Sequence, residues 1–316
     1  MSGFSHPMPM AVSGGRCAPV WPLWRGMTRM RDMFNEGRKV SSMEEKRSDQ
    51  IKLRHFNTAP ALAALSDAGI VWFRDVDITA GRHDGQRVLF ATDKEADPIQ
   101  RAHRNASFYE AEELAMLRAH VKRVATFVDI GANVGNHTLY AAMFLGAARV
   151  IPVEPNPLAL RLLLINVMMN GIEDRVITTG LGLGLGARAA EGFGMESRHK
   201  NLGAAKMLDG AGDIAVITGD TLLAAEKPDF IKIDVEGMEM DALSGLAETI
   251  ARCRPRMLVE VDQQNYDAFD AWCAETGYTV VETIQRYATN KNFLLKPVAK
   301  TTKRKAKPSS ATRAAA

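Results

Sequence analysis

Several features are scarce in this 316-residue chain, and each scarcity excludes a class of protein. The three cysteines, Cys17, Cys253 and Cys273, are too few and too scattered for a disulfide framework or a zinc site. Apolar runs are short, because none approaches the roughly 18 residues that a membrane-spanning helix needs. The N-terminus lacks the basic start and continuous apolar segment of a signal peptide. We therefore expect a cytoplasmic protein without a transmembrane segment.

Acidic residues are absent from the end of the chain, and this absence explains the net charge. From Lys296 onward the sequence has seven basic residues, no acidic residue and no aromatic residue. Such a composition cannot bury enough apolar surface to fold, so we predict a disordered basic tail over 298–316. Removing seven positive charges from the net charge of +3 leaves −4 for the remainder. The basic balance therefore describes the tail and says little about a substrate.

The rest of the chain divides into three predicted regions. Residues 1–45 mix proline, glycine, methionine and arginine without a period, which predicts a poorly ordered extension. Residues 46–120 form a smaller helix and hairpin region, and 121–297 form the main domain. We expect this smaller α+β region to shape the site that binds the substrate.

The predicted elements of the N-terminal region come from local patterns. A helical pattern covers 48–68, and residues 70–73 (Ile-Val-Trp-Phe) read as a strand. A turn over 81–85 leads to a hairpin partner at 87–90. Residues 108–120 place acidic residues early and basic residues late, which suits the dipole of a helix.

From Thr126 onward, short apolar strands alternate with helices. This pattern predicts an α/β fold with a mostly parallel sheet that is covered on both faces. The last two strands lack an intervening helix and should form an antiparallel hairpin at the sheet edge. The predicted strands cover 126–130, 149–154, 175–181, 230–234, 257–261, 278–284 and 292–295. The predicted helices cover 136–145, 157–169, 238–251 and 266–275.

The segment with the clearest chemical signal follows the first of these strands. A buried strand ends in Asp129, and a tight turn with Gly131 and Gly135 leads into a helix. The two glycines allow a ligand to approach the backbone without a Cβ in the way. In open α/β sheets, ligands bind beyond the carboxyl ends of the strands. We therefore expect a ligand site at this turn.

The second strand indicates a nucleoside. Glu154 stands at its end, about 20 residues beyond the turn, where a carboxylate can accept hydrogen bonds from two ribose hydroxyls. The turn does not match the dinucleotide pattern GxGxxG, and Asp129 beside it would repel a pyrophosphate. A cationic ligand such as S-adenosylmethionine suits it better. A formal match to the dinucleotide pattern at 182–187 is followed by a poor helix, so we interpret 180–186 as a flexible loop beside the adenine.

Four stretches resemble the FkbM family of S-adenosylmethionine-dependent methyltransferases. They are VDIGANVGNHTLYAA (128–142), GAARVIPVEPNP (146–157), PDFIKIDVEGMEMDALSG (228–245) and PRMLVEV (255–261). The resemblance implies a Rossmann-like class I methyltransferase fold, with a seven-stranded sheet and a C-terminal antiparallel hairpin. It also implies S-adenosyl-L-methionine as cofactor and O-methylation of a hydroxyl on a sugar, glycan or small metabolite.

The resemblance further implies the cofactor-binding residues. Those at the methionine end would be Asp129, Gly131, Asn133 and Gly135. Glu154 would hold the ribose with Asn156 nearby, and Asp234 would face the same pocket. The sequence departs from the family after the third strand, where the glycine-rich stretch 180–186 replaces the usual segment near the adenine.

Methyl transfer from a sulfonium needs an aligned hydroxyl and a group that removes its proton. Candidates are Asp234, Glu236 and Glu239 after the fourth strand, Glu260 after the fifth, and His137. Our hypothesis gives the catalytic role to Asp234, with Glu236 second, and expects these two to face opposite ways along a strand. Lys232, within the strand, could pair with a carboxylate. No metal triad is evident, so we expect no metal.

Two alternatives stay open at this point. One is a protein that keeps the cofactor on this fold but does not transfer the methyl group. The other is a nucleic-acid methyltransferase, which the basic tail suggests and which the turn after the fourth strand (Asp234-Val-Glu-Gly237) disfavours. The expected partner is a small-molecule or glycan acceptor rather than a nucleic acid, and the oligomeric state is left open.

Overall fold

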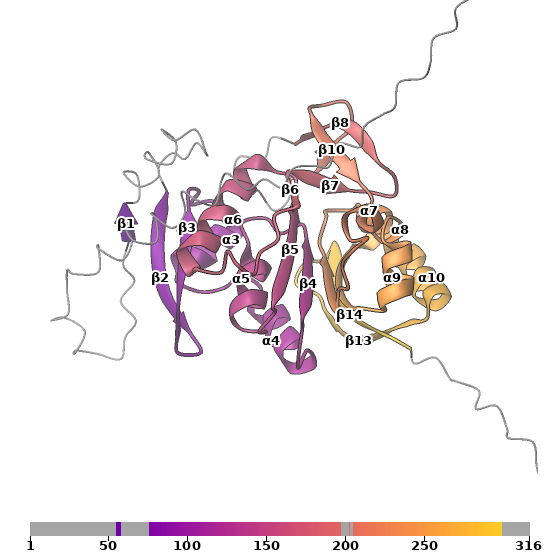
Figure 1. Cartoon of the computed structure of the whole chain (residues 1–316), viewed down its shortest axis with the longest axis horizontal. Coiled ribbons are helices and arrows are strands. Elements are labelled where there is room, and N and C mark those ends of the chain that lie inside the picture. Colours follow the sequence, from indigo (N-terminus) through magenta and orange to yellow (C-terminus); the bar gives the residue numbers. More distant parts are fainter. Residues whose placement is uncertain (1–54, 58–75, 197–201, 203–204, 299–316) are drawn as a thin grey trace, which may run out of the picture. The chain divides into compact units, whose positions relative to one another are not determined.

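The computed structural model describes residues 55–57, 76–196, 202 and 205–298, which belong to one compact unit (Figure 1). The described part contains no helix long and apolar enough to cross a membrane. The following predictions lie outside the described residues: the extension over 1–45, the strand over 70–73, most of the helix over 48–68, and the basic tail beyond 298.

A seven-stranded mixed sheet forms the centre of the described part, with strand order β13-β14-β12-β11-β4-β5-β6. Strands β12, β11, β4, β5 and β6 run parallel to one another, while β14 is antiparallel to both β12 and β13. The α/β class and the C-terminal antiparallel hairpin are confirmed. The strands are β4 (Thr126–Ile130), β5 (Arg149–Glu154), β6 (Gly180–Leu181), β11 (Phe230–Ile233), β12 (Arg256–Asp262), β13 (Tyr278–Ile284) and β14 (Asn290–Pro297).

Helices cover both faces of this sheet (Figure 1). The burial of alternate strand residues divides the core in two: Phe127 and Phe230 stack 5.2 Å apart on one face, while Val128 and Ile231 pack on the other. One layer contains α4 (Ala111–His120), α5 (Asn136–Met143) and α6 (Pro157–Asn170). The other contains α8 (Glu239–Ser244), α9 (Ala247–Cys253) and α10 (Tyr266–Thr276). The shorter helices are α7 (Gly219–Leu222) and the 3₁₀ helix η3 (Gln263–Asn265).

Two predicted elements of the main domain are wrong in detail. The helix expected over 238–251 is two helices that meet at Gly245, where a Cβ would lie only 2.1 Å from the carbonyl oxygen of Gly186. The strand expected over 175–181 joins the sheet through an isolated bridge at Val176 and through β6 alone.

The N-terminal hairpin is built from β2 (Asp77–His83) and β3 (Gln86–Thr92), with β1 (His55–Asn57) beside β2. The predicted helix over 48–68 is therefore wrong at 55–57. The first hairpin strand is 77–83, and the turn narrows to Asp84 and Gly85. Helix α3 (Pro98–Arg104) follows the hairpin.

Two asparagines of α6 hold the hairpin against the main domain. The Oδ1 of Asn166 accepts from the Ala91 backbone N–H at 2.7 Å. The side-chain amide of Asn170 both accepts from the N–H and donates to the carbonyl of Leu89, at 2.9 and 2.7 Å. These side chains satisfy backbone groups of β3 much as a neighbouring strand would.

A small second sheet follows β6, with strand order β7-β10-β8-β9. The glycine-rich stretch 180–186, predicted as a flexible loop, forms β6 and β7 instead. Gly184 lies in close contact with Met207, because a Cβ there would be 2.5 Å from the Met207 sulfur. The strands are β7 (Leu183–Leu185), β8 (Ala190–Met195), β9 (Met207–Leu208) and β10 (Ile214–Ile217).

Candidate functional site

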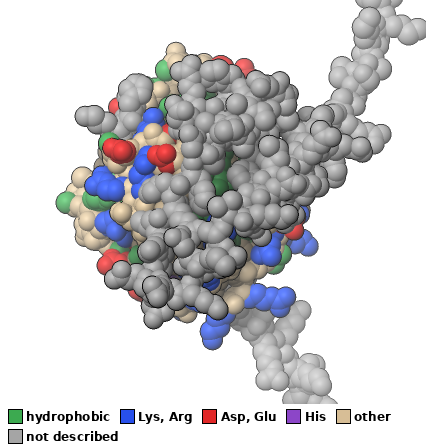
Figure 2. All heavy atoms as spheres, turned by 90° about the vertical axis from the view of Figure 1, so that its left-hand side faces the viewer, with side chains coloured by type: hydrophobic (Ala, Val, Ile, Leu, Met, Phe, Trp, Pro, Cys, Tyr) green, Lys and Arg blue, Asp and Glu red, His purple; other side chains and the backbone are tan. Residues whose placement is uncertain are grey.

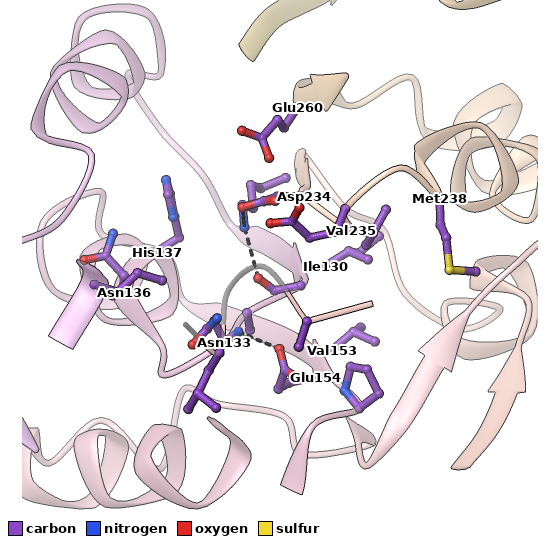
Figure 3. A pocket seen from close by; sticks show the side chains of 18 of the residues that line it. Ile130, Asn133, Asn136, His137, Val153, Glu154, Asp234, Val235, Met238 and Glu260 are labelled. Carbon is purple, nitrogen blue, oxygen red and sulfur yellow. Dashed lines mark hydrogen bonds and ion pairs between the residues drawn. The ribbon is translucent and has the colours of Figure 1, made fainter. Parts of the chain in front are cut away.

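A cavity of about 250 Å³ lies at the carboxyl ends of β4, β5, β11 and β12 (Figure 3). Four of the residues that the sequence predicted as cofactor ligands line it: Gly131, Asn133, Glu154 and Asp234. The other three do not. Asp129, Gly135 and Asn156 lie behind the cavity wall, where each supports a residue or helix that forms the wall.

The glycine turn after β4 has a backbone that only glycine fits at its tightest point. Gly131 has a φ of 75°, and a Cβ there would lie 1.8 Å from the carbonyl oxygen of Asp234. The N–H groups of Gly131 and Ala132 both donate to the Val153 carbonyl at 3.0 Å. This turn is therefore locked between β5 and β11, with its backbone exposed to the cavity.

Gly135 serves the helix behind the turn. It precedes α5 with a φ of 90°, and a Cβ there would lie 3.2 Å from the Leu163 side chain of α6. The glycine thus permits close packing between the start of α5 and α6.

The Glu154 carboxylate at the end of β5 is held by two backbone donors. The N–H of Asn133 donates to its Oε2 and the N–H of Asn156 to its Oε1, both at 2.7 Å. Burial raises the pKa of Glu154 to about 7, against the effect of these donors. The Asn156 side chain caps α6 by accepting from Leu158 N–H at 3.1 Å, so Asn156 acts through Glu154 and the helix start.

Lys232 connects the turn after β4 with the end of β11. It is 4% exposed, and its ammonium donates to the Gly131 carbonyl at 3.1 Å and pairs with Asp234 at 3.0 Å. Burial opposes its charge, but the carboxylates of Asp234, Asp129 and Glu110 outweigh burial and raise its pKa. The expected pairing of Lys232 with a carboxylate is thus present. It is the only lysine or arginine among the described residues that line the cavity.

Asp129 lies beneath the turn and is fully buried. Its Oδ2 accepts from the Thr138 hydroxyl at 2.6 Å, and its Oδ1 is 3.7 Å from the Lys232 ammonium. Burial raises its pKa, and Lys232 and Thr138 oppose that rise. Asp129 therefore anchors Lys232 and α5 rather than facing a ligand.

Three carboxyl groups gather on the other side of Lys232: oxygens of Asp234, Glu236 and Glu260 lie within 4.8 Å of one another. The expectation that Asp234 and Glu236 point apart is wrong. Residues two positions apart share a face of an extended strand, and both also line the cavity from the loop after β11, where Glu236 has a φ of 52°. Such a grouping can hold a metal ion, an arrangement that the sequence analysis did not anticipate. Lys232 already supplies a positive charge beside it.

The pKa values of Asp234 and Glu260 are shifted in opposite directions. Burial favours the neutral form of Asp234, but the Lys232 ammonium outweighs it and holds the pKa of Asp234 below its usual range. Burial, with the charge of Asp234 and a hydrogen bond to it, raises the pKa of Glu260 to about 11. Glu260 therefore stays protonated at neutral pH and Asp234 stays ionised. Glu239, another sequence candidate, lies outside the cavity and accepts from the Asp262 N–H at 2.9 Å.

The N-terminal region is expected to shape the substrate site, but the sequence identifies none of the residues that do so. Tyr109 and Glu110, just before α4, line the cavity opposite Asp234. The Tyr109 hydroxyl lies 2.7 Å from that of Tyr287, which follows β13. No motif marks these residues, and hydrogen bonds between Tyr109 and Asn136 at the start of α5 help to hold them at the site.

The remaining wall is apolar and comes largely from the small sheet and the residues beside it. Its members are Leu185, Met195, Leu202, Ala205, Met207 and Met238. This wall lies along the glycine-rich stretch, because Gly184 also lines the cavity. A flat apolar group such as a purine base suits such a surface.

Comparison with family models matches residues 129–280 to the methyltransferase FkbM domain. A comparison with the curated proteins found no match. Among solved structures, the chain is similar to methyltransferase FkbM from Methylobacillus flagellatus KT, at 20% identity and a TM-score of 0.40. That match covers 54% of this chain and 43% of the M. flagellatus protein, so this chain spans less than half the length of that protein.

Two further solved structures are similar at lower identity. The tRNA m1G37 methyltransferase of M. jannaschii is 13% identical with a TM-score of 0.40, covering 70% of this chain and 54% of that one. The TrmK protein of M. capricolum, solved with S-adenosyl-homocysteine, is 9% identical with a TM-score of 0.37. That match covers 58% of this chain and 67% of the TrmK chain.

Proposed function

Residues 129–280 form a methyltransferase domain of the FkbM family, and on this premise we propose that the chain is an S-adenosylmethionine-dependent O-methyltransferase. Its acceptor is a hydroxyl group of a sugar, glycan or small metabolite. The observation that carries the proposal is the Glu154 carboxylate, fixed by two backbone donors at the rim of a cavity beside a glycine turn. The strand order of the central sheet supports a Rossmann-like class I arrangement.

The residues of the cavity fit S-adenosylmethionine along its length. The ribose hydroxyls would donate to Glu154, and the apolar wall around Met195 and Met207 would receive the adenine. The methionine end would lie over Gly131 and Asn133, which line the cavity together with Asp234. The cofactor supplies an activated methyl group on a positive sulfur.

The surplus of carboxyl groups favours this cationic cofactor. Glu110, Asp234, Glu236 and Glu260 line the cavity against one lysine, Lys232. An ionised carboxylate such as Asp234 repels phosphates, and carboxyl groups in either protonation state accept hydrogen bonds from hydroxyl groups. An uncharged polyhydroxyl acceptor therefore suits the cavity better than a phosphate-bearing one, and Tyr109 and Tyr287 add two further hydroxyls at the same side.

The transfer itself is an in-line displacement, in which the protein aligns the acceptor oxygen with the S–CH₃ bond. Asp234, ionised and fixed by Lys232, suits the orientation of the acceptor or of the methionine amino group. Glu236 beside it is a second polar contact for the acceptor.

A nucleic-acid acceptor is the second candidate, favoured by the basic residues from Lys296 onward. On the described part of the face in Figure 2, however, basic and acidic side chains are interspersed rather than gathered by sign. Removing residues 299–316 discriminates between the two: we expect unchanged methyl transfer to a small acceptor, whereas a nucleic-acid enzyme would lose affinity for its substrate.

Calorimetric titration of the full-length protein tests the cofactor claim. We expect saturable 1:1 binding of S-adenosylmethionine and of S-adenosylhomocysteine, and none of NAD. Radiolabelled S-adenosylmethionine, offered with a panel of monosaccharides and glycosides and separately with total tRNA, then tests the acceptor class. Absence of cofactor binding overturns the proposal, whereas binding without transfer to any acceptor supports the non-catalytic alternative.

A further inference from the structure

Resting on the proposed function, we propose that Glu110 is the catalytic base, which takes the proton from the acceptor hydroxyl, with His137 positioned beside it. Glu110 lines the cavity, and its Oε2 lies 3.8 Å from His137 Nε2. Both side chains are largely enclosed, at 15% and 5% exposure.

The backbone at Glu110 is held in place from the main domain. The Oδ1 of Asn136 accepts from the Tyr109 N–H at 2.9 Å, and its Nδ2 donates to the Tyr109 carbonyl at 3.0 Å. Glu110 follows with a φ of 56°, a left-handed conformation that a glutamate rarely adopts, and α4 begins directly after it. Strained backbone of this kind persists where the surroundings impose it, and it clusters at functional sites. Asn133 and Glu236, with φ of 50° and 52°, share this property and the same cavity.

The His137 ring beside Glu110 has a nitrogen that makes no hydrogen bond within the described part of the chain. Among the described residues, its Nε2 has no hydrogen-bond partner. In Figure 3 its ring lies beside Asn136, to the left of Asp234 and Glu260. Burial and the charge of Lys232 lower its pKa to about 3, so the imidazole is neutral and a weak base. It can orient a hydroxyl between itself and Glu110.

The other candidates are less suited to accept the proton. Asp234 is paired with Lys232, which lowers its pKa, and Glu260 already carries a proton. Burial raises the pKa of Glu110 to about 8, near the working pH of a general base. The charged or titratable groups that face Glu110 come from five segments: Asp234 and Lys232 (β11 and its end), Glu113 (α4), Arg286 (after β13), His137 (α5) and Glu260 (β12).

The step balances without another reactant. A lone pair of the acceptor oxygen attacks the methyl carbon, and the S–C bond breaks with its electrons staying on sulfur. The hydroxyl proton passes to the Glu110 carboxylate, which becomes a carboxylic acid and later releases the proton to water. The products are the methyl ether, S-adenosylhomocysteine and a proton.

The cofactor would also prepare the base. Free Glu110 is mostly protonated at neutral pH, and a cationic cofactor in the same cavity favours its ionised form. Cofactor binding should therefore release a proton and tighten as the pH rises toward 9. Glu154 contributes a release of its own at lower pH, because its pKa is about 7.

The test uses the full-length protein, S-adenosylmethionine as the probe, and calorimetry at pH 7.5 in phosphate and Tris buffers. The variant is Glu110→Gln, and the control is Glu112→Gln, an exposed residue two positions away. We expect the wild type and E112Q to release the same number of protons. E110Q should release fewer by roughly half a proton, with affinity within about threefold of the wild type.

Equal proton release from E110Q and the wild type overturns the proposal. A more than tenfold loss of affinity in E110Q also overturns it and makes Glu110 a cofactor ligand. If the wild type, E110Q and E112Q all fail to bind the cofactor, the proposed function itself fails. That outcome is distinct from a failure of the role proposed for Glu110. On any acceptor that the wild type methylates, E110Q should be at least about 100-fold slower at saturating cofactor, and equal rates contradict a base.

Discussion

Lys232 Nζ lies 3.0 Å from Asp234 Oδ2, and the two residues sit two positions apart at the end of β11. Alternate residues of an extended chain share a face, so Lys232 and Asp234 point to the same side. Asp129 is paired with Lys232 in register on the neighbouring strand β4, and its carboxylate lies 3.7 Å from the ammonium. One buried cation thus holds two carboxylates and the carbonyl of the glycine turn. The shape of the cavity depends on this single ammonium.

Lys232→Met should therefore destabilise the protein by about 3–5 kcal/mol, because it leaves the buried carboxylate of Asp129 and the partly buried one of Asp234 without their cation. Urea unfolding at pH 7 measures the change. Lys227→Met, at an exposed lysine five positions earlier, is the control and should change stability by less than about 0.5 kcal/mol. Similar stability of both variants would contradict the role of Lys232.

Gly131→Ala should cost more than the same substitution at Gly146. Both glycines have a left-handed φ, 75° and 69°, so both variants suffer the backbone penalty of about 1 kcal/mol. A Cβ at Gly131 also meets the Asp234 carbonyl at 1.8 Å, while at Gly146 it meets nothing within 4 Å. We expect G131A to lose a further 1–3 kcal/mol, estimated from overpacking, and its cofactor binding. G146A should keep that binding in calorimetry.

Glu154→Gln keeps the size of the side chain and removes the charge. An amide can accept one ribose hydroxyl but presents a donor to the other, and it also meets the Asn133 or Asn156 N–H with its NH₂ group. We expect S-adenosylmethionine affinity to fall at least about tenfold, or roughly 1.4 kcal/mol. Glu248→Gln, at an exposed position on α9, should bind like the wild type. Unchanged affinity in E154Q would remove Glu154 from the ribose site.

Glu110→Gln should stabilise the protein without ligand at pH 9 more than at pH 5.5. The pKa of Glu110 is about 8 in the fold, well above that of an unfolded glutamate, so its contribution is present at low pH and is lost as the pH rises through 8. The neutral amide avoids this loss, by an amount on the order of 2 kcal/mol. Urea unfolding at both pH values, with E112Q as control, measures it. A gain that is independent of pH would show that Glu110 does not titrate there.

The strands that form the sheet centre could be predicted from the sequence because their signals are local. Strands β4 and β5 are continuous apolar runs that end in or near an acidic residue, and the predicted limits of β4, β5 and β13 match the structure. Glu154 and the glycine turn follow directly from those limits. The hairpin of β13 and β14 follows from the missing helix between them.

Other features depend on contacts between distant segments, which no local pattern contains. Gly245 interrupts a helical pattern because it touches Gly186, far away in the sequence. Asp234 and Glu236 reach the cavity from the loop after β11, where Glu236 has a left-handed φ of 52° that the strand pattern does not indicate. Glu110 is held at the cavity by the Asn136 hydrogen bonds to its neighbour Tyr109, and an acidic residue before a helix otherwise reads as an ordinary helix start.

The cavity is closed by chain on both sides of the segment that matches the family. Tyr109 and Glu110 precede residue 129, and Tyr287, Thr289 and Asn290 follow residue 280. The core behind Glu110 also continues from Phe90 and Phe108 to Phe127 and Leu139. A shortened protein cut at the family limits would thus expose this core and open two walls of the cavity. A protein prepared for crystallisation or a ligand screen should therefore retain residues 76–298.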